Sequence, residues 1–378
     1  MTNSIKKINL FGLLVLLTLL SAAQNPNRVK EPDMLNTPVR REIRLPEIPG
    51  FEIIKSDFHM HTVFSDGLVW PTIRVEEAYY EGLDAIAITE HIEYRPNREL
   101  VKGDHNSAYD IAKPRADQLN ILLVKAGEIS RSMPPGHIIA LFVDDANKLE
   151  TPEYMDALKE ARNQGAYIFW AHPGWDAQQP DTTLWWDEHQ QMLDNDLLHG
   201  LEVFNWDEWY PIAMGWAKDK NLTWMANSDI HIVASHRFNL EKYFRPMNLV
   251  FARERTMESL KEALFERRSV ALFLDNLAGP DELLQSLFHH SVAIGKPFHT
   301  NENGTRLVEL KNITDLTFKL ENLEPENGAT PTLNLLPGSS VIMTIPATGA
   351  NELKLTYKGV NMHTGMFENA IIMLDMEP

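Results

Sequence analysis

The sequence predicts an α/β fold followed by a small β-sandwich-like domain. From residue 51 to about residue 275, short β-rich runs alternate with helical stretches, which favours strand–helix units in a mostly parallel sheet or barrel. Beyond about residue 285, short β-type runs are separated by Asn, Gly and Pro, which is typical of a β-sandwich. We therefore expect a barrel domain over residues 51–284 and an accessory domain over residues 285–378.

Composition limits the classes of function. The chain has 378 residues, of which 44% are hydrophobic, as in a globular protein. Acidic residues outnumber basic ones by 53 to 35, and the net charge of -18 disfavours nucleic-acid binding as a primary role. The absence of cysteine excludes disulfides and thiolate metal sites, so any metal must be held by nitrogen and oxygen.

The N-terminus has the pattern of an export signal. Lys6 and Lys7 precede an apolar run over residues 8–20, and Ser21-Ala22-Ala23 supplies small residues for cleavage before Gln24. The run is shorter than the roughly 20 residues that span a bilayer, so residues 1–23 are expected to be a signal peptide. Residues 24–50 are rich in Pro, Asn and charge, and should be extended. The mature protein should be periplasmic or secreted, without a stable membrane anchor.

The expected strands are short runs of β-forming residues. Seven precede residue 230: Glu52–Phe58, Asp84–Thr89, Ile121–Ala126, His137–Val143, Ala166–Trp170, Gly200–Phe204 and Leu222–Ala226. Four belong to the accessory domain: Arg306–Leu310, Leu316–Leu320, Val341–Ile345 and Glu352–Tyr357.

Three helices have recognisable boundaries. Pro71–Glu81 begins with proline at a favoured first position and has its apolar residues along one side. Pro152–Gln164 repeats this design and ends at Gly165. Residues 256–267 open with a threonine cap.

Candidate metal ligands gather where the expected strands end. His59 and His61 are two residues apart at the end of the first strand, so both imidazoles project to the same face. The carboxyl ends of parallel strands meet at one edge, which predicts that further candidates converge there. These are Asp66, His91, Glu128, His172, Asp229 and His231, together with His137 at the start of its own strand.

These motifs together resemble the PHP (polymerase and histidinol phosphatase) superfamily. The motifs are His59-x-His61, Ser65-Asp66-Gly67, Thr89-Glu90-His91, Gly127-Glu128, Gly136-His137, Ala171-His172-Pro173 and Ser228-Asp229-x-His231. The resemblance covers about residues 51–275. It implies a distorted seven-stranded (β/α) barrel whose C-terminal mouth holds up to three metal ions and hydrolyses phosphate esters.

The resemblance also implies a ligand set and a catalytic centre. His59, His61, Glu128 and Asp229 would bind one ion, and Glu128 would bridge to a second ion held by His137 and His172. A third ion would be held by Asp66, His91 and His231. Glu90 stands where the family commonly has Asp, and we expect it outside the ligand set because His91 takes the inward-facing place.

The implied cofactors are two to three divalent ions, Zn²⁺ or Mn²⁺, with iron as an alternative. Carboxylate-bridged ions lower the pKa of bound water toward ~7 and hold phosphoryl oxygens for in-line attack. Three divalent ions, three carboxylates and one hydroxide leave a charge of about +2, which suits an anionic phosphate. The sequence contains no GxSxG, P-loop or GxGxxG motif.

Four residues are candidate substrate contacts. Arg95, Arg131 and Arg237 follow ligand-bearing strands, and their guanidinium groups suit phosphate oxygens. Arg237 is preferred because it lies six residues after His231. Trp175 is expected to stack on substrate. Structural ion pairs for the arginines, and packing for the tryptophan, remain alternatives.

We therefore expect an exported metal-dependent phosphoesterase that acts on a small phosphorylated substrate, a mono- or diester. Two alternatives stay open: a protein that binds metal, anion or polymer without turnover, and a metal-dependent amide or cyclic-ester hydrolase. The accessory domain is expected to pack against the barrel. The oligomeric state is left open.

Overall fold

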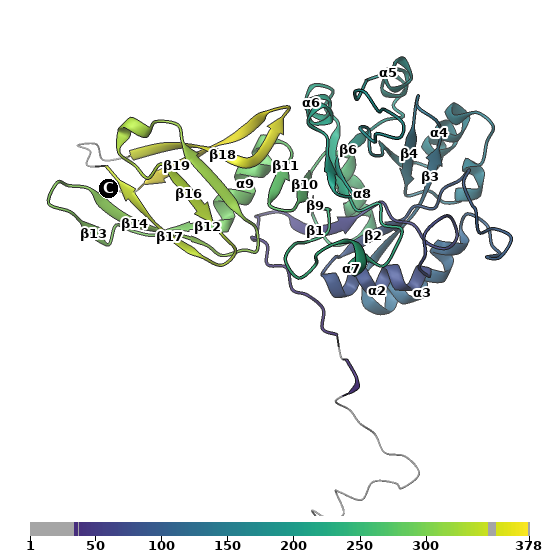
Figure 1. Cartoon of the computed structure of the whole chain (residues 1–378), viewed down its shortest axis with the longest axis horizontal. Coiled ribbons are helices and arrows are strands. Elements are labelled where there is room, and N and C mark those ends of the chain that lie inside the picture. Colours follow the sequence, from purple (N-terminus) through teal and green to yellow (C-terminus); the bar gives the residue numbers. More distant parts are fainter. Residues whose placement is uncertain (1–33, 37, 347–352, 377–378) are drawn as a thin grey trace, which may run out of the picture. The chain divides into compact units, whose positions relative to one another are not determined.

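The computed structural model describes residues 34–36, 38–346 and 353–376, and residues 40–378 form one of its two units (Figure 1). The expected signal peptide lies outside the described residues, as does part of the expected extended segment. Among the described residues, no helix has both the length and the apolar character needed to cross a bilayer.

The seven expected barrel strands all form, with modest shifts in their ends. Neighbouring strands follow the order β1-β2-β3-β4-β5-β6-β8. Their bounds are Glu52–Asp57 (β1), Ala85–Ile88 (β2), Leu122–Ser130 (β3), His137–Leu141 (β4), Tyr167–Trp170 (β5), Gly200–Asn205 (β6) and Thr223–Asn227 (β8). The short β7 (Glu208–Trp209) pairs with β6. The predicted α/β barrel is thus confirmed.

One strand of the barrel runs against the others. β4 is antiparallel to both β3 and β5, whereas the pairs β1–β2, β2–β3, β5–β6 and β6–β8 are parallel. β3 and β4 are joined by residues 131–136 without a helix, and so short a connection allows only an antiparallel return. Consequently the start of β4, at His137, lies opposite Ser130 near the end of β3.

An eighth strand, not expected from the sequence, follows β8 in the chain and adjoins β1 in the sheet. β9 (Met247–Ala252) pairs antiparallel with β1. In the described part of the chain, β9 has no backbone ladder with β8, and the side chain of Asn248 links the two strands instead. Its Oδ1 accepts from the Ala226 N–H at 2.9 Å, and its Nδ2 donates to the Ala226 carbonyl at 2.9 Å. A single amide side chain therefore bridges this seam of the barrel.

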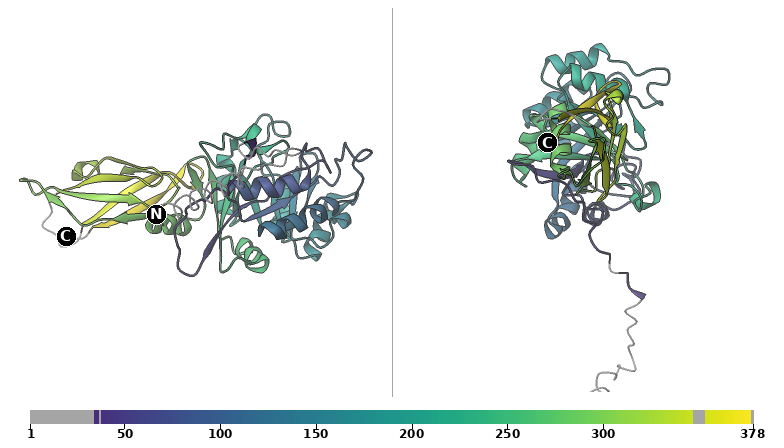
Figure 2. Two further views of the ribbon diagram at one scale, coloured as in Figure 1. Left: turned by 90° about the horizontal axis from the view of Figure 1, so that it is seen from below. Right: turned by 90° about the vertical axis from the view of Figure 1, so that its left-hand side faces the viewer.

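Most helices cover the outside of the barrel strands, whereas the last helix contacts strands of the accessory domain (Figures 1 and 2). The helices are α2 (Pro71–Glu81), α3 (Ser107–Leu119), α4 (Tyr154–Asn163), α5 (Asp187–Asp194), α6 (Pro211–Asp219), α7 (Ala234–Arg237), α8 (Met257–Phe265) and α9 (Asp281–Ser291), with 3-10 turns η2 (Ala146–Leu149) and η3 (Pro325–Asn327). The sequence predicted α2, α4 and α8. It missed α3, which contains Pro114 but buries an alanine face against α2.

Apolar side chains fill the inside of the barrel. Inward-facing residues include Ile54, Val124, Ile139, Phe169 and Met225, and each is at most 1% exposed. Side chains of α8 join the same cluster. Because the interior is filled, polar chemistry is confined to the strand ends, as in other α/β barrels.

α5 carries a buried histidine that is not part of any candidate metal group. The His189 ring stacks on Trp170 with centroids 3.6 Å apart. Its Nε2 lies 2.7 Å from the Pro135 carbonyl, and its Nδ1 accepts from the Trp186 N–H at 3.2 Å. These partners define a neutral ring, and burial lowers the pKa of His189 to about 4.

The accessory domain is a two-sheet sandwich, as predicted (Figures 1 and 2). One sheet contains β12 (Val292–Ile294), β13 (His299–Thr300), β14 (Arg306–Asn312) and β17 (Ser340–Ile345). The other contains β15 (Phe318–Asn322), β16 (Thr332–Leu335), β18 (Leu353–Gly365) and β19 (Glu368–Met376). Alternate residues such as Val308, Leu310, Phe318 and Leu320 are buried between them.

The accessory domain is joined to the barrel through its sheet. β10 (Ser269–Phe273) pairs with β9, β11 (Asn276–Ala278) pairs with β10, and β11 pairs in parallel with β18. The His363 ring of β18 lies 5.2 Å from the Trp209 ring of β7, and Lys218 of α6 forms an ion pair with Glu368 of β19. β18 and β19 therefore contact the segment that follows β6.

Candidate metal centre

The first candidate group surrounds the two histidines that follow β1. His59 and His61 are fully buried. Their Nε2 atoms lie 3.3 and 3.2 Å from Glu128 Oε2, and both lie 3.1 Å from Asp229 Oδ1. The four residues that the family resemblance assigns to one ion thus face one another.

The second candidate group lies at the other oxygen of Glu128. His137 Nδ1 is 2.6 Å from Glu128 Oε1, and His172 Nε2 is 3.9 Å from the same oxygen. The two imidazole rings are 5.0 Å apart. Glu128 therefore presents Oε2 to the first group and Oε1 to the second, which is the arrangement a bridging carboxylate needs.

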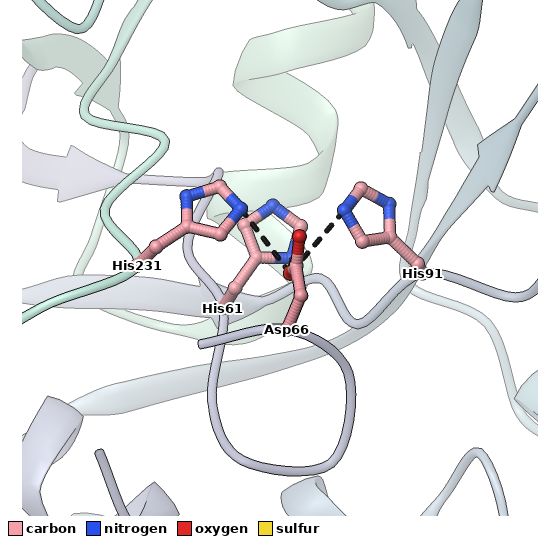
Figure 3. Close-up of side chains that lie close together, drawn as sticks. All are labelled: His61, Asp66, His91 and His231. Atoms are coloured by element: carbon pink, nitrogen blue, oxygen red, sulfur yellow. Dashed lines mark ion pairs between the residues drawn. The ribbon is translucent and has the colours of Figure 1, made fainter. Parts of the chain in front are cut away.

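The third candidate group is drawn in Figure 3. Asp66 Oδ1 lies 3.4 Å from His91 Nε2 and 3.2 Å from His231 Nε2, between the two rings. His61 lies close by, and the four residues offer ligand atoms within 4.8 Å of one another. His91 Nδ1 is also 3.2 Å from Glu128 Oε2, so the third group adjoins the other two.

Asp66 reaches this place because the next residue has no side chain. A Cβ on Gly67 would stand 2.6 Å from the His61 carbonyl carbon and 2.7 Å from the Thr62 nitrogen. The Gly67 N–H donates to the Thr62 carbonyl at 2.9 Å. Only glycine lets the loop press so closely on the end of β1.

Two candidate ligands have an unusual backbone. His172 and Asp229 have φ angles of +29° and +48°, in the left-handed region that non-glycine residues rarely adopt. The His172 N–H donates to Glu202 Oε2 at 2.7 Å, and the Asp229 N–H donates to the His59 carbonyl at 2.8 Å. Such local strain is typical of functional positions.

Glu202 of β6, which the sequence analysis did not single out, supports several of these residues. It is fully buried, and its Oε1 lies 3.0 Å from His59 Nδ1. Its Oε2 accepts from the His172 N–H and from Asn205 Nδ2, both at 2.7 Å. The sequence signal that could have identified Glu202 is an acidic residue inside an otherwise apolar strand.

Glu90 accepts hydrogen bonds from Thr62 and Ser65.

Hydrogen bonds on one ring nitrogen orient several histidines. His59 Nδ1 faces Glu202, His91 Nδ1 lies 2.6 Å from Ser130 Oγ, and His231 Nδ1 lies 2.7 Å from the Asp229 carbonyl. The other ring nitrogen, Nε2, then faces the carboxylate of a candidate ligand in each case. This is how outer residues usually fix the tautomer of a metal-binding histidine.

The donor atoms fit divalent ions. Several are buried and have no hydrogen-bond partner: His59 Nε2, His61 Nε2, Asp66 Oδ1, both oxygens of Glu128, His137 Nδ1 and Asp229 Oδ1. Buried polar atoms without partners are rare in proteins unless something else satisfies them. A set of imidazole nitrogens and carboxylate oxygens suits zinc, manganese or iron.

The charges within the centre are strongly coupled. Burial disfavours a charged His59, but Asp229, Glu202 and Glu128 outweigh it and raise the pKa of His59 well above its usual value. Burial also opposes the charging of His61, yet the adjacent carboxylates of Asp229 and Glu128 outweigh burial and raise the pKa of His61 to about 9. For His172 burial dominates and lowers the pKa to about 3.

The carboxylates respond in the opposite sense. Burial would raise the pKa of Glu128, Asp229 and Asp66, but the adjoining histidines outweigh burial and hold each pKa well below its usual value. The three acids are therefore ionised, as metal ligands must be.

A pocket of about 350 Å³ opens onto the centre. Trp175 lies in its wall, with its ring 5.2 Å from the ring of His172 and 5.7 Å from that of His137. The described lining residues are Asp66, His91, Glu128, His137, His172, Trp175, Asn205, Trp206, Asp207, Glu208, Tyr210, Asp229 and His231.

The three expected arginine contacts do not line this pocket, because their guanidinium groups have other partners. Arg95 donates to the carbonyls of Phe64 and Gly103. Arg131 donates to the carbonyls of Thr151 and Pro152 and pairs with Glu93 at 2.8 Å. Arg95 and Arg131 are thus bound by protein groups, and neither is among the described residues that line the pocket.

Arg237 lies nearer to the pocket but is also engaged. Its Nη2 is 2.7 Å from Asp207 Oδ2, and its guanidinium carbon stands 4.5 Å from the centroid of the Trp206 ring. Both partners line the pocket. Arg237 was expected to contact the phosphate directly. In the structure it contacts two residues of the pocket wall and is not itself among the described lining residues.

Comparisons with known proteins agree with this architecture. A family model described as an Ig-like domain matches residues 292–375. A crystal structure from Bacteroides vulgatus ATCC 8482, described as a two-domain protein containing a predicted PHP-like metal-dependent phosphoesterase, is 41% identical. The match covers 90% of this chain and 100% of that one, with a TM-score of 0.86.

More distant solved structures are also similar. A provisionally assigned metal-dependent phosphoesterase from Bifidobacterium adolescentis ATCC 15703 is 18% identical, with coverage of 49% of this chain and 89% of that one and a TM-score of 0.37. An amidohydrolase from Chromobacterium violaceum is 15% identical, with coverage of 48% and 88% and a TM-score of 0.36. No curated protein matches the chain in sequence.

On the strength of the Bacteroides relative, the chain belongs to the PHP-like metal-dependent phosphoesterase family, in a two-domain form with a C-terminal Ig-like domain.

Proposed function

We propose that the protein is an exported phosphoesterase that hydrolyses a small phosphomono- or diester at a site holding three divalent ions. The observation that carries the proposal is the convergence of nine side chains beside one pocket, in four overlapping groups that share His59, His61, His91 and Glu128. The predicted activity of the Bacteroides relative supports the same reaction class.

The residues have distinct tasks in this proposal. Bound divalent ions would supply an activated water and positive charge for the phosphoryl oxygens. Glu128 offers one oxygen to each of two neighbouring groups, and Glu202 keeps the rings and backbone around it in place. Trp175 forms part of the wall that limits water beside the reacting phosphate.

The test is a metal-quantified preparation assayed on phosphomono-, di- and triesters. We expect hydrolysis of a mono- or diester, its loss on treatment with a chelator, and its return with Zn²⁺ or Mn²⁺. Activity that survives complete removal of metal would refute the proposal.

Two variants and one control sharpen this experiment. Glu128→Gln and Asp229→Asn should lose bound metal and activity together while retaining the circular dichroism of the parent. Glu258→Gln, at an exposed position of α8, should change neither. Tight metal without turnover on any ester would instead identify a binding protein, and turnover confined to amides or cyclic esters would identify the other hydrolase class.

Export is tested separately. The full chain should be recovered outside the cytoplasm with its mature N-terminus at Gln24, as read by mass spectrometry. An uncleaved N-terminus on cytoplasmic protein would contradict this part of the proposal alone.

A further inference from the structure

The pocket wall that the candidate ligands do not form has a particular chemistry. It consists of Trp175 and of five residues from one segment, Asn205, Trp206, Asp207, Glu208 and Tyr210. That segment runs from the end of β6 through β7 to the start of α6. No lysine or arginine stands among the described residues of the pocket lining.

Several polar side chains of this wall are hydrogen-bonded to other protein groups. Asn205 Nδ2 donates to Glu202 at 2.7 Å, and the Tyr210 hydroxyl donates to Glu208 Oε2 at 2.8 Å. Arg237 Nη2 donates to Asp207 Oδ2 at 2.7 Å. What remains for a ligand is mostly a set of acceptors, the amide oxygen of Asn205 and the second carboxylate oxygens of Asp207 and Glu208. The donors that remain in this wall are the indole N–H groups of Trp175 and Trp206 and the second amide N–H of Asn205.

Two tryptophans flank the metal ligands. The Trp175 ring stands beside His137 and His172, whereas the Trp206 ring lies 6.1 Å from the ring of His231. Arg237 lies over the Trp206 ring at 4.5 Å and holds it in place. The wall therefore combines aromatic surface with acceptor oxygens.

These features select among alcohols that a phosphate ester can carry. A ligand with a second phosphate or a carboxylate on its alcohol part would bring negative charge to Asp207, which already pairs with Arg237, and to Glu208, and the described lining offers no lysine or arginine to bind it. An apolar alcohol would remove water from these acceptors and return no hydrogen bond. A polyhydroxylated ring offers hydroxyl donors at its edge and C–H surface on its faces.

Building on the proposed phosphoesterase function, we propose that the substrate is the phosphate monoester of an uncharged sugar or polyol. Its hydroxyls would donate to Asn205, Asp207 and Glu208, and its carbon skeleton would pack on Trp175 and Trp206. The pocket of about 350 Å³ is near the lower end of the roughly 300–1,000 Å³ usual for small ligands, which suits one sugar unit.

The reaction is a simple hydrolysis. The oxygen of water forms a bond to phosphorus, the bond between phosphorus and the sugar oxygen breaks, and that oxygen takes a proton. The products are inorganic phosphate and the free sugar.

The experiment compares esters that share a primary phosphate. Metal-loaded protein is assayed on glucose 6-phosphate, sorbitol 6-phosphate, butyl phosphate, phosphoethanolamine, 6-phosphogluconate and fructose 1,6-bisphosphate. We expect kcat/KM for the two uncharged polyol esters to exceed that of each of the others by at least about tenfold.

Variants tie the preference to the wall. Glu208→Gln and Asp207→Asn should each lower the ratio of kcat/KM between glucose 6-phosphate and butyl phosphate by about fivefold or more, mainly through KM. Glu258→Gln, on the exposed face of α8, should keep the ratio of the parent. Quenching of tryptophan fluorescence by free glucose should weaken in the two wall variants, which gives a readout independent of turnover.

The outcomes separate the two proposals. Hydrolysis of esters without a polyol preference, or with preference for the ammonium or doubly anionic substrates, would overturn the sugar assignment and leave the phosphoesterase standing. An unchanged ratio in both wall variants would overturn it as well. Failure to hydrolyse any mono- or diester would refute the phosphoesterase, and the sugar assignment with it, whereas hydrolysis of diesters alone would overturn only the sugar assignment.

Discussion

Replacing Glu202 by glutamine should weaken metal binding, although Glu202 is not a candidate ligand. Four groups approach its two oxygens: His59 Nδ1 and Asn227 Nδ2 at Oε1, and the His172 N–H and Asn205 Nδ2 at Oε2. Glutamine has one acceptor oxygen and one NH₂ group, so two of the four would meet a donor instead of an acceptor.

The magnitude follows from this arrangement. Glu202 is fully buried, and a hydrogen bond to a charged group is worth about 1.5–3 kcal/mol, so losing two destabilises the fold by about 3 kcal/mol or more. The ring of His59 and the backbone of His172 lose their orientation at the same time. Loss of such supporting contacts typically lowers metal affinity by about 10–100-fold, and we expect that range here.

Competition with a chelator of known affinity measures the effect, with metal content determined by elemental analysis and stability by urea unfolding. Glu258→Gln is the matched control, because it makes the same chemical change at an exposed position of α8. If Glu202→Gln retained the metal content, affinity and unfolding midpoint of the parent, the supporting role of Glu202 would be wrong.

Three further predictions concern other parts of the chain. Gly67→Ala should displace the loop that carries Asp66 and remove about one equivalent of bound metal, counted by elemental analysis, because its Cβ would stand 2.6 Å from backbone. His189 binds a proton in the unfolded chain below about pH 6.5 but in the folded protein only below about pH 4, so stability should fall as pH drops through this window, by up to about 3 kcal/mol; His189→Gln should flatten that dependence in urea unfolding. His363→Ala removes the ring that lies 5.2 Å from Trp209 and should raise KM by about 2–10-fold with a smaller change in kcat, measured by steady-state kinetics.

Each of these has an opposing result. Full metal content in Gly67→Ala would show that the loop tolerates a side chain. An equally steep loss of stability in acid for His189→Gln would assign that loss to other groups. Unchanged kinetics in His363→Ala would separate the accessory domain from the pocket wall.

Much of the barrel could be predicted because its signals are local. Alternating strand and helix patterns indicate the α/β class, and a spacing of two residues in a strand puts His59 and His61 on one face. The carboxyl ends of the strands of such folds lie on one side, which explains why acids and histidines that are scattered in the sequence could be grouped from the sequence alone. The expected seven strands accordingly form.

Other features depend on partners that are distant in sequence. β9 escaped prediction because its place is set by pairing with β1 and by the single side chain of Asn248. The role of Glu202 depends on four donors from three other strand ends and from its own. Arg95 and Arg131 were expected to contact the substrate, but in the structure their guanidinium groups donate to backbone carbonyl groups of other loops.

The chemical type of the centre follows from the amino-acid sequence, which contains imidazoles and carboxylates but no thiols. The sequence also indicates which strand ends carry these groups. How these side chains are shared between overlapping groups, and which neighbours hold them, depends on the folded chain. The physical reason is one of range: periodicity and turn chemistry act over a few residues, whereas the direction of β4, the reach of Glu128 to two groups and the acceptor-rich pocket wall exist only after the barrel has closed.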